Sequence, residues 1–157
     1  MIIQNFNLVS EGISSNTYLE LESEYVYSKL DSTQSPQDFV SIMCDLFHLN
    51  TQSNKSFWLI GLDAKKQPLI FSRIPHNWNN DSVHATRAIM RRALLANAFN
   101  IILVRNDLSA NLAVSDDEIK ICKRINRAAK LLDVVLSDYI IINSVDNYIS
   151  FATENIL

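Results

Sequence analysis

The stretch Ile101–Glu118 constrains the fold more than any other part of the chain. Asn100–Val104 is a short apolar run, which is typical of a strand in the centre of a sheet covered on both faces. A polar loop follows, and Ser115 and Glu118 then form a capping box with negative charge throughout the first helical turn. Loops between buried strands and helices often carry active sites. We therefore expect a functional site within residues 105–118.

The rest of the chain alternates between strand and helix patterns. We predict helices over Pro36–Leu49, Val83–Ala98 and Asp116–Leu132. We predict strands over Tyr18–Leu30 (a strand or hairpin arm with acidic Glu20, Glu22 and Glu24), Ser56–Leu62, Gln67–Ile74, Val134–Asn143 and Tyr148–Phe151, the last pairing with its predecessor. Strands that alternate with helices predict an α/β fold with a mixed central sheet.

Two of the predicted helices carry basic residues. The helix over Val83–Ala98 is expected to bury Ile89, Met90, Ala93 and Leu94 and to expose Arg87, Arg91 and Arg92. The helix over Asp116–Leu132 carries a basic stripe at helical spacing: Lys120, Lys123, Arg124, Arg127 and Lys130. Residues 1–50 hold seven acidic side chains and one basic side chain, Lys29, and so net −6, whereas residues 51–157 net +3. The two parts could attract each other, within one chain or between copies.

Composition excludes several classes of protein. The chain has only two glycines, which rules out a Rossmann fingerprint and a P-loop because both need closely spaced glycines. Two cysteines, Cys44 and Cys122, lie in helical patterns and are interpreted as buried thiols in a reducing compartment. No apolar run approaches the roughly 20 residues of a membrane span, and the amino terminus lacks a basic n-region. We expect a cytoplasmic protein without membrane partners.

Five segments together resemble a known family: FWLIGLDAKKQPLI, SVHATRAIMRRALLANAFNIILV, LSANLAVSDDE, AAKLLDVVLSDYIII and the ending YISFATENIL. From about Phe57 to Leu157 the chain resembles the RadC branch of the JAB/MPN metalloprotease-like domains. The resemblance implies a cytidine-deaminase-like α-β-α fold, with a JAB domain at 51–157. Residues 1–50 would then be an N-terminal extension, a strand or hairpin plus the helix Pro36–Leu49, packed on that domain.

The resemblance also implies a zinc site, which this sequence has altered. Similar proteins carry an upstream glutamate, then the motif His-x-His-Pro-Ser-Gly, and then the motif Pro-Ser-x-x-Asp at the start of a helix. The two histidines and the aspartate bind zinc, and the glutamate acts as the base. The serine that caps the helix helps to stabilise the oxyanion. The upstream glutamate falls at Ser72 or Arg73, the histidines at Arg105 and Asp107, the aspartate at Glu118, and the two serines at Ser109 and Ser115. Only the two serines match, so these are interpreted as vestigial positions.

Arg105 decides the interpretation of this site. A guanidinium has no lone pair to donate and stays protonated. A cation about 4 Å from a zinc ion would be repelled by roughly 8 kcal/mol at an effective dielectric constant near 20. We therefore expect no zinc and no other cofactor, with Arg105 paired to Asp107, Asp117 or Glu118. The first hypothesis is a catalytically inactive JAB domain retained as an interaction or scaffold module, self-associating through Tyr18–Leu30 and the basic stripe.

Two alternatives remain open. One is a hydrolase with a rebuilt metal site that uses Asp107, Glu118 and His84, near which His76 also lies. The other is a module that binds DNA non-specifically through the basic stripe, in keeping with the DNA-repair label of the family. The remaining polar candidates have simpler structural interpretations: His48 at a helix end, and Asp138 as a hydrogen-bond acceptor within a strand.

Overall fold

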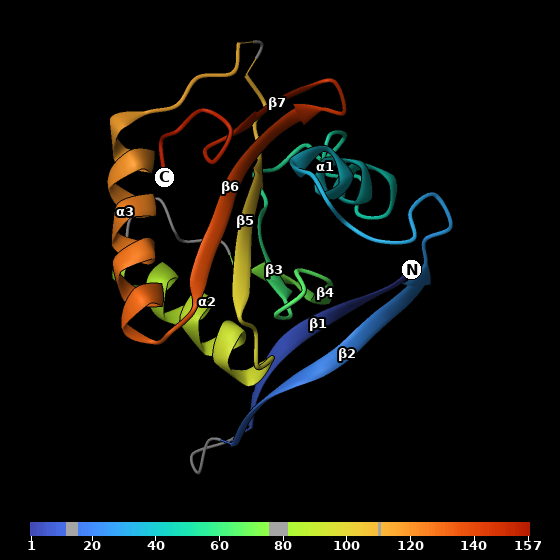
Figure 1. The fold of residues 1–157 in the computed structure, drawn as a ribbon, viewed down its shortest axis with the longest axis vertical. Helices are drawn as coiled ribbons and strands as arrows, with labels where there is room; N and C mark the ends of the chain where they lie inside the picture. The colour runs from blue at the N-terminus through green and yellow to red at the C-terminus, as the bar shows by residue number, and fades with distance from the viewer. Residues whose placement is uncertain (12–15, 76–81, 110) are drawn as a thin grey trace.

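The computed structural model describes residues 1–11, 16–75, 82–109 and 111–157, and it places a seven-stranded sheet between helices (Figure 1). The strands are β1 (Ile2–Glu11), β2 (Asn16–Val26), β3 (Phe57–Leu62), β4 (Pro68–Ile74), β5 (Asn100–Asn106), β6 (Val135–Ser144) and β7 (Asn147–Ser150). The helices are α1 (Pro36–Asp45), α2 (Ser82–Leu95) and α3 (Asp116–Leu131).

The sheet is mixed, as the sequence predicts. Its strand order is β2-β1-β4-β3-β5-β6-β7. β5 pairs in parallel with β6, and β1 in parallel with β4, while the other neighbours are antiparallel. The parallel pair β5–β6 requires a crossover, which α3 provides. β7 pairs with β6 across a tight turn, which confirms the predicted pairing of the last two strands.

Two apolar layers cover the two faces of the sheet, which gives the expected α-β-α arrangement. On one face, α2 and α3 pack on side chains such as Leu59, Leu103 and Ile141. On the other face, α1 packs on alternate residues of the same strands, such as Trp58 and Ile60. No helix in the described parts of the chain is both long and apolar enough to cross a membrane.

The N-terminal hairpin extends this sheet rather than standing apart from it. β1 pairs with β2 along its whole length and with β4 at Asn5 and Phe71. Ile3 lies in the same buried cluster as α1 and β3. The pairing register shifts where Asn5 faces Ser23 and Phe6 faces Leu21, so that Glu22 is an extra residue, a β-bulge. The domain boundary at residue 50 stays a prediction.

Two residues of α2 have the opposite exposure to the one predicted. Arg92 is only 2% exposed, whereas Leu94, expected to be buried, is 51% exposed. Arg92 is buried because its side chain finds partners there: Nε donates to Ser72 Oγ at 3.0 Å, and a terminal nitrogen donates to the Ala88 carbonyl at 3.1 Å. The pKa of Arg92 is lowered to about 10, mainly by burial and to a smaller extent by the positive charge of nearby Arg91.

Two helices end earlier than the sequence predicts. α1 stops at Asp45 rather than Leu49, and His48 lies in the left-handed region at φ 51°. α2 stops at Leu95 rather than Ala98, and Asn97 adopts φ 52°. A left-handed residue ends a helix, and asparagine tolerates that conformation better than most side chains.

Candidate functional site

An open pocket lies where β5 ends and α3 begins. Its volume is about 470 Å³, and polar side chains from three segments line it. The lining residues are Lys55, Ser56, Phe57, Arg105, Asp107, Ser109, Ser115, Asp117, Glu118 and Ile121. The structure thus gathers five of the seven vestigial positions in one place, because β5 delivers Arg105 and the loop after it leads directly to the first turn of α3.

Arg105 lies at the base of this pocket and is held by two carboxylates. Its guanidinium forms an ion pair with Glu118 through Nε and a terminal nitrogen. The other terminal nitrogen lies 3.0 Å from Asp107 Oδ2 and also donates to the Asn106 carbonyl. All three ionised side chains are largely buried. Of the three acidic partners expected for Arg105, two therefore pair with it, while Asp117 pairs with Lys120 instead.

Glu118 connects the ion cluster to the start of α3. One of its oxygens accepts hydrogen bonds from the Ser115 amide at 3.0 Å and the Ser115 hydroxyl at 3.2 Å. The other oxygen accepts from Arg105 and, at 3.4 Å, from the Tyr139 hydroxyl. The Glu118 amide in turn donates to Ser115 Oγ, which completes the capping box that the sequence predicts. Both carboxylate oxygens of Glu118 therefore already have donors.

Asp107 is fixed in the same way by its own loop. Its Oδ1 accepts from the Ser109 amide at 2.8 Å and the Ser109 hydroxyl at 2.6 Å, while Oδ2 faces Arg105. Burial tends to raise the pKa of the Asp107 carboxyl, but the hydrogen bonds from Ser109 and the charge of Arg105 outweigh it and lower the pKa. The side-chain amide of Asn143 in β6 donates hydrogen bonds to the carbonyls of Asp107 and Ser109 and so anchors the loop to the sheet.

The charges of the cluster reinforce one another. Burial tends to lower the pKa of Arg105, but the neighbouring Tyr139, Glu118 and Asp107 outweigh that effect and raise it. Burial also raises the pKa of Tyr139 well above its ordinary value, so the phenol stays protonated and donates to Glu118. Tyr139 is the member of this cluster that the sequence did not reveal, since its partners lie in other elements.

The two remaining vestigial positions lie on different faces of β4. Ser72 is fully buried and accepts a hydrogen bond from Arg92, on the face covered by α2. Arg73 is exposed and donates to Ser56 Oγ at 3.0 Å. Neither side chain is a carboxylate, so the position that the resemblance assigns to a general base holds a hydroxyl or a cation.

The histidines proposed for a rebuilt metal site lie outside the described parts of the chain: His76 entirely, and His84 by its side chain. Among the residues described, no group of three or more His, Cys, Asp or Glu side chains is arranged to hold a metal ion. Asp138 makes structural hydrogen bonds: its carboxylate accepts from the Ser150 hydroxyl at 2.6 Å and from the Ala152 amide at 2.9 Å.

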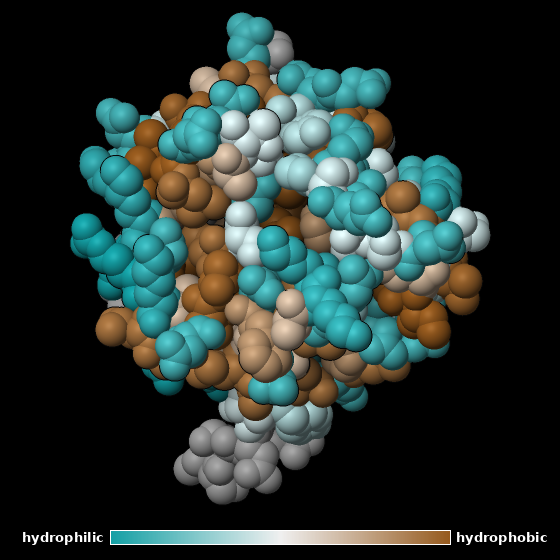
Figure 2. Space-filling view, viewed as in Figure 1, coloured by the Kyte–Doolittle hydropathy of each residue, from teal (hydrophilic) through white to brown (hydrophobic). Residues whose placement is uncertain are grey.

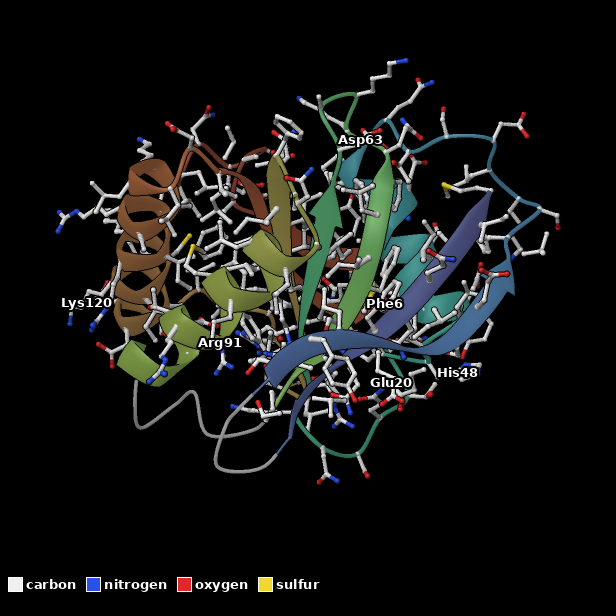
Figure 3. All side chains as sticks on the ribbon, turned by 90° about the horizontal axis from the view of Figure 1, so that it is seen from below. Phe6, Glu20, His48, Asp63, Arg91 and Lys120 are labelled. Atoms are coloured by element: carbon white, nitrogen blue, oxygen red, sulfur yellow. The ribbon has the colours of Figure 1, made fainter. Side chains whose placement is uncertain are left out.

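The basic stripe follows the outer face of α3. Lys123, Arg124, Arg127 and Lys130 are exposed, and Lys120 lies 2.9 Å from Asp117 on the same helix. Figure 3 shows Lys120 on α3 and Glu20 on the hairpin on different sides of the molecule. The stripe and the acidic strand therefore belong to separate surfaces.

Comparison with known proteins identifies the family of the chain. A family model of the RadC-like JAB domain matches residues 33–156. The chain belongs to the RadC-like JAB domain family. Curated relatives of this RadC-like chain include UPF0758 proteins of Finegoldia magna (27% identical, covering 74% of this chain and 51% of the relative) and Pseudomonas fluorescens (30%, covering 72% and 48%). The RadC-like chain spans about half the length of these relatives.

Proposed function

We propose that this RadC-like JAB domain works without zinc and without hydrolysis, as an interaction module, in the cytoplasm. The observation that carries the proposal is the guanidinium of Arg105, which lies at the base of the pocket between Glu118 and Asp107. A catalytic zinc site needs three protein ligands and an open position for water. Here one of the three corresponding side chains is a cation with no lone pair.

The two remaining carboxylates do not compensate for that loss. Glu118 and Asp107 are already paired with Arg105 and also accept hydrogen bonds from Ser115, Tyr139 and Ser109. A metal ion would have to displace Arg105 and leave its charge uncompensated in a largely buried position, which costs several kcal/mol per ion, about the scale of a buried charge without a partner. The donor set therefore does not fit zinc, and we derive no hydrolytic step through it.

Metal analysis of protein purified without chelators tests the absence of zinc. We expect substoichiometric zinc in the wild-type chain and no cleavage of peptide substrates. The matched variant restores the ligand types at the three positions: Arg105→His, Asp107→His and Glu118→Asp together. It should bind more zinc than the wild type under the same conditions. Stoichiometric zinc in the wild-type chain, or peptide cleavage by it, would overturn the proposal.

The charge pattern supports contact through two surfaces. Strand β2 of the hairpin contributes Glu20, Glu22 and Glu24, while α3 presents the basic stripe. Reversing two stripe charges, Lys123→Glu and Arg127→Glu, should weaken self-association while leaving the fold intact, because both side chains are exposed. Sizing chromatography measures the change, and circular dichroism checks the fold. An oligomer that is unchanged in size would count against the stripe as a contact.

A second candidate function is non-specific DNA binding by the same stripe. It is favoured by the exposure of basic residues at helical spacing along α3. Contacts between basic side chains and phosphates weaken steeply as salt rises, because binding releases counterions. Binding to unrelated duplexes at low and moderate salt tests this, and an affinity that does not depend on salt would remove the candidate.

A further inference from the structure

Six large apolar side chains are exposed at or just after the ends of α2 and α3. Leu94 and Leu95 come from the end of α2, Phe99 from the turn before β5, Leu131 and Leu132 from the end of α3, and Val135 from the start of β6. We name these six residues the end patch. Leu131 is the most exposed of them, at 86%. Apolar patches on the order of several hundred Å² often mark sites of protein interaction.

Part of the end patch surrounds a hollow. Leu94, Phe99 and Leu132 line one shallow depression of about 150 Å³. The Val135 amide donates to the Phe99 carbonyl at 3.0 Å, which holds these two residues side by side. Figure 2 shows brown, hydrophobic atoms between teal ones on the side of the molecule where α2 and α3 lie. The hollow can receive an apolar side chain from another molecule.

A second apolar surface lies on the N-terminal hairpin. Ile2 and Val26 are directly opposite each other in the pairing of β1 with β2, and Val26 is 79% exposed. Gln4 faces Glu24 in the next pair on the same side, and Leu21 follows opposite Phe6. We name Ile2, Gln4, Leu21, Glu24 and Val26 the hairpin strip. β2 is also an edge strand of the sheet, so its outer side has no neighbouring strand among those described.

The two surfaces differ in charge. The hairpin strip contains Glu24, and the same strand carries Glu20 and Glu22. The surroundings of the end patch are mainly basic: Arg127 and Lys130 lie on the last turns of α3, and one acidic residue, Asp133, lines the hollow. Apolar surfaces with rims of opposite charge are complementary, and such rims orient the partners and speed association.

We propose that the hairpin strip of one copy docks on the end patch of a second copy, head to tail. The inference rests on the proposed function as an interaction module and names its partner. Figure 1 shows the open end of the hairpin, near the N-terminus, on the side of the molecule away from α3, so one copy cannot make this contact with itself. Each copy thus offers one strip and one patch, and the assembly grows with concentration or closes into a ring.

Two single substitutions separate this arrangement from its alternatives. Leu131→Asp places a charge on the end patch, and Val26→Asp places one on the hairpin strip. Both side chains are highly exposed, so the fold should be retained. Leu108→Asp is the matched control, because Leu108 is an exposed leucine on neither surface. The average mass is measured by light scattering over a range of protein concentrations.

The expected result has three parts. The wild type and the Leu108→Asp variant gain mass as concentration rises, whereas each of the other variants stays a monomer or associates at least tenfold more weakly. A mixture of Leu131→Asp with Val26→Asp forms complexes of two chains and no larger, because one intact patch and one intact strip remain between them.

Several outcomes would overturn the inference. A wild type that stays monomeric at every concentration would do so, and so would a Val26→Asp variant that assembles like the wild type, since the patch would then contact something other than the strip. A mixture that does not form the two-chain complex would also count against it. None of these results bears on zinc or hydrolysis, so metal analysis still tests the proposed function separately.

Discussion

Arg105 at the end of β5 and Glu118 in the first turn of α3 form an ion pair at the base of the pocket. The same Glu118 side chain closes the capping box with Ser115. One carboxylate therefore joins the sheet to the helix and neutralises a buried cation. The pocket of this RadC-like domain is filled by a charge cluster whose members support one another, which makes the cluster part of the folded core.

The first prediction concerns the ion pair itself. Arg105→Met should lower the free energy of unfolding by about 3 kcal/mol, because it leaves Glu118 and Asp107 largely buried without their cation. Urea denaturation followed by circular dichroism measures the change. The double variant Arg105→Met with Glu118→Gln should recover part of the loss, since it removes one uncompensated charge. If the single variant is as stable as the wild type, the cluster does not stabilise the fold.

The second prediction concerns acid stability. The pKa of Asp107 is lowered from its ordinary 3.8, because the Ser109 hydrogen bonds and Arg105 outweigh the effect of burial. The stabilising contribution of the carboxylate is therefore present above pH 3.8 and is lost as the pH falls through the lower folded-state pKa.

Asp107→Asn should lower the free energy of unfolding at neutral pH by about 1–2 kcal/mol and flatten its dependence on pH below about 4. Urea midpoints measured across the acidic range test both effects. An equally steep acid dependence in the variant would show that other carboxyls cause it.

The third prediction separates a structural from a chemical role of Ser115. Its side chain accepts the Glu118 amide at the start of α3. Ser115→Ala should lower the free energy of unfolding by about 1 kcal/mol, as expected for the loss of a helix cap. Ser115→Thr keeps a capping hydroxyl and should lose much less. Thermal and urea unfolding of both variants provide the measurement, and equal losses in the two would argue against capping.

The fourth prediction concerns the two thiols. Cys44 and Cys122 are both buried, and burial raises their pKa values to about 11 and about 12, with a smaller upward contribution from nearby carboxylates. Because the thiolate is the reactive form, both cysteines should react with Ellman's reagent far more slowly in the native protein than in urea. The absorbance of the released thiolate follows the reaction. Rapid labelling of either native thiol would contradict its burial.

Local signals in the sequence predicted much of the fold. The start of α3 at Asp116 follows from Ser115 and Glu118, which form a capping box within four consecutive residues. β5 follows from an apolar run of the kind found in strands covered on both faces, and the side chains of residues 101–106 are all buried. In each case the pattern that defines the element lies within the element or directly beside it in the sequence.

Contacts between distant residues could not be predicted in the same way. Arg92 was assigned to the exposed face of α2 because the hydrogen bond that buries it ends on Ser72, on another element. The strand β1 was not predicted, since its mixed residues become a strand only through pairing with β2 and β4. The place of Tyr139 in the ion cluster likewise depends on Glu118, 21 residues earlier.

The bulge at Glu22 interrupts the regular alternation of side chains between the two faces along β2. Leu19 packs toward the layer of α2 and α3, whereas Tyr25 packs toward the layer of α1. Regular alternation would place Leu19 and Tyr25 on the same face of the sheet, because they are an even number of positions apart, so the extra residue is what lets them pack in different layers. The number of residues in β2 therefore matters as much as their identity, even though β2 is an edge strand of the sheet.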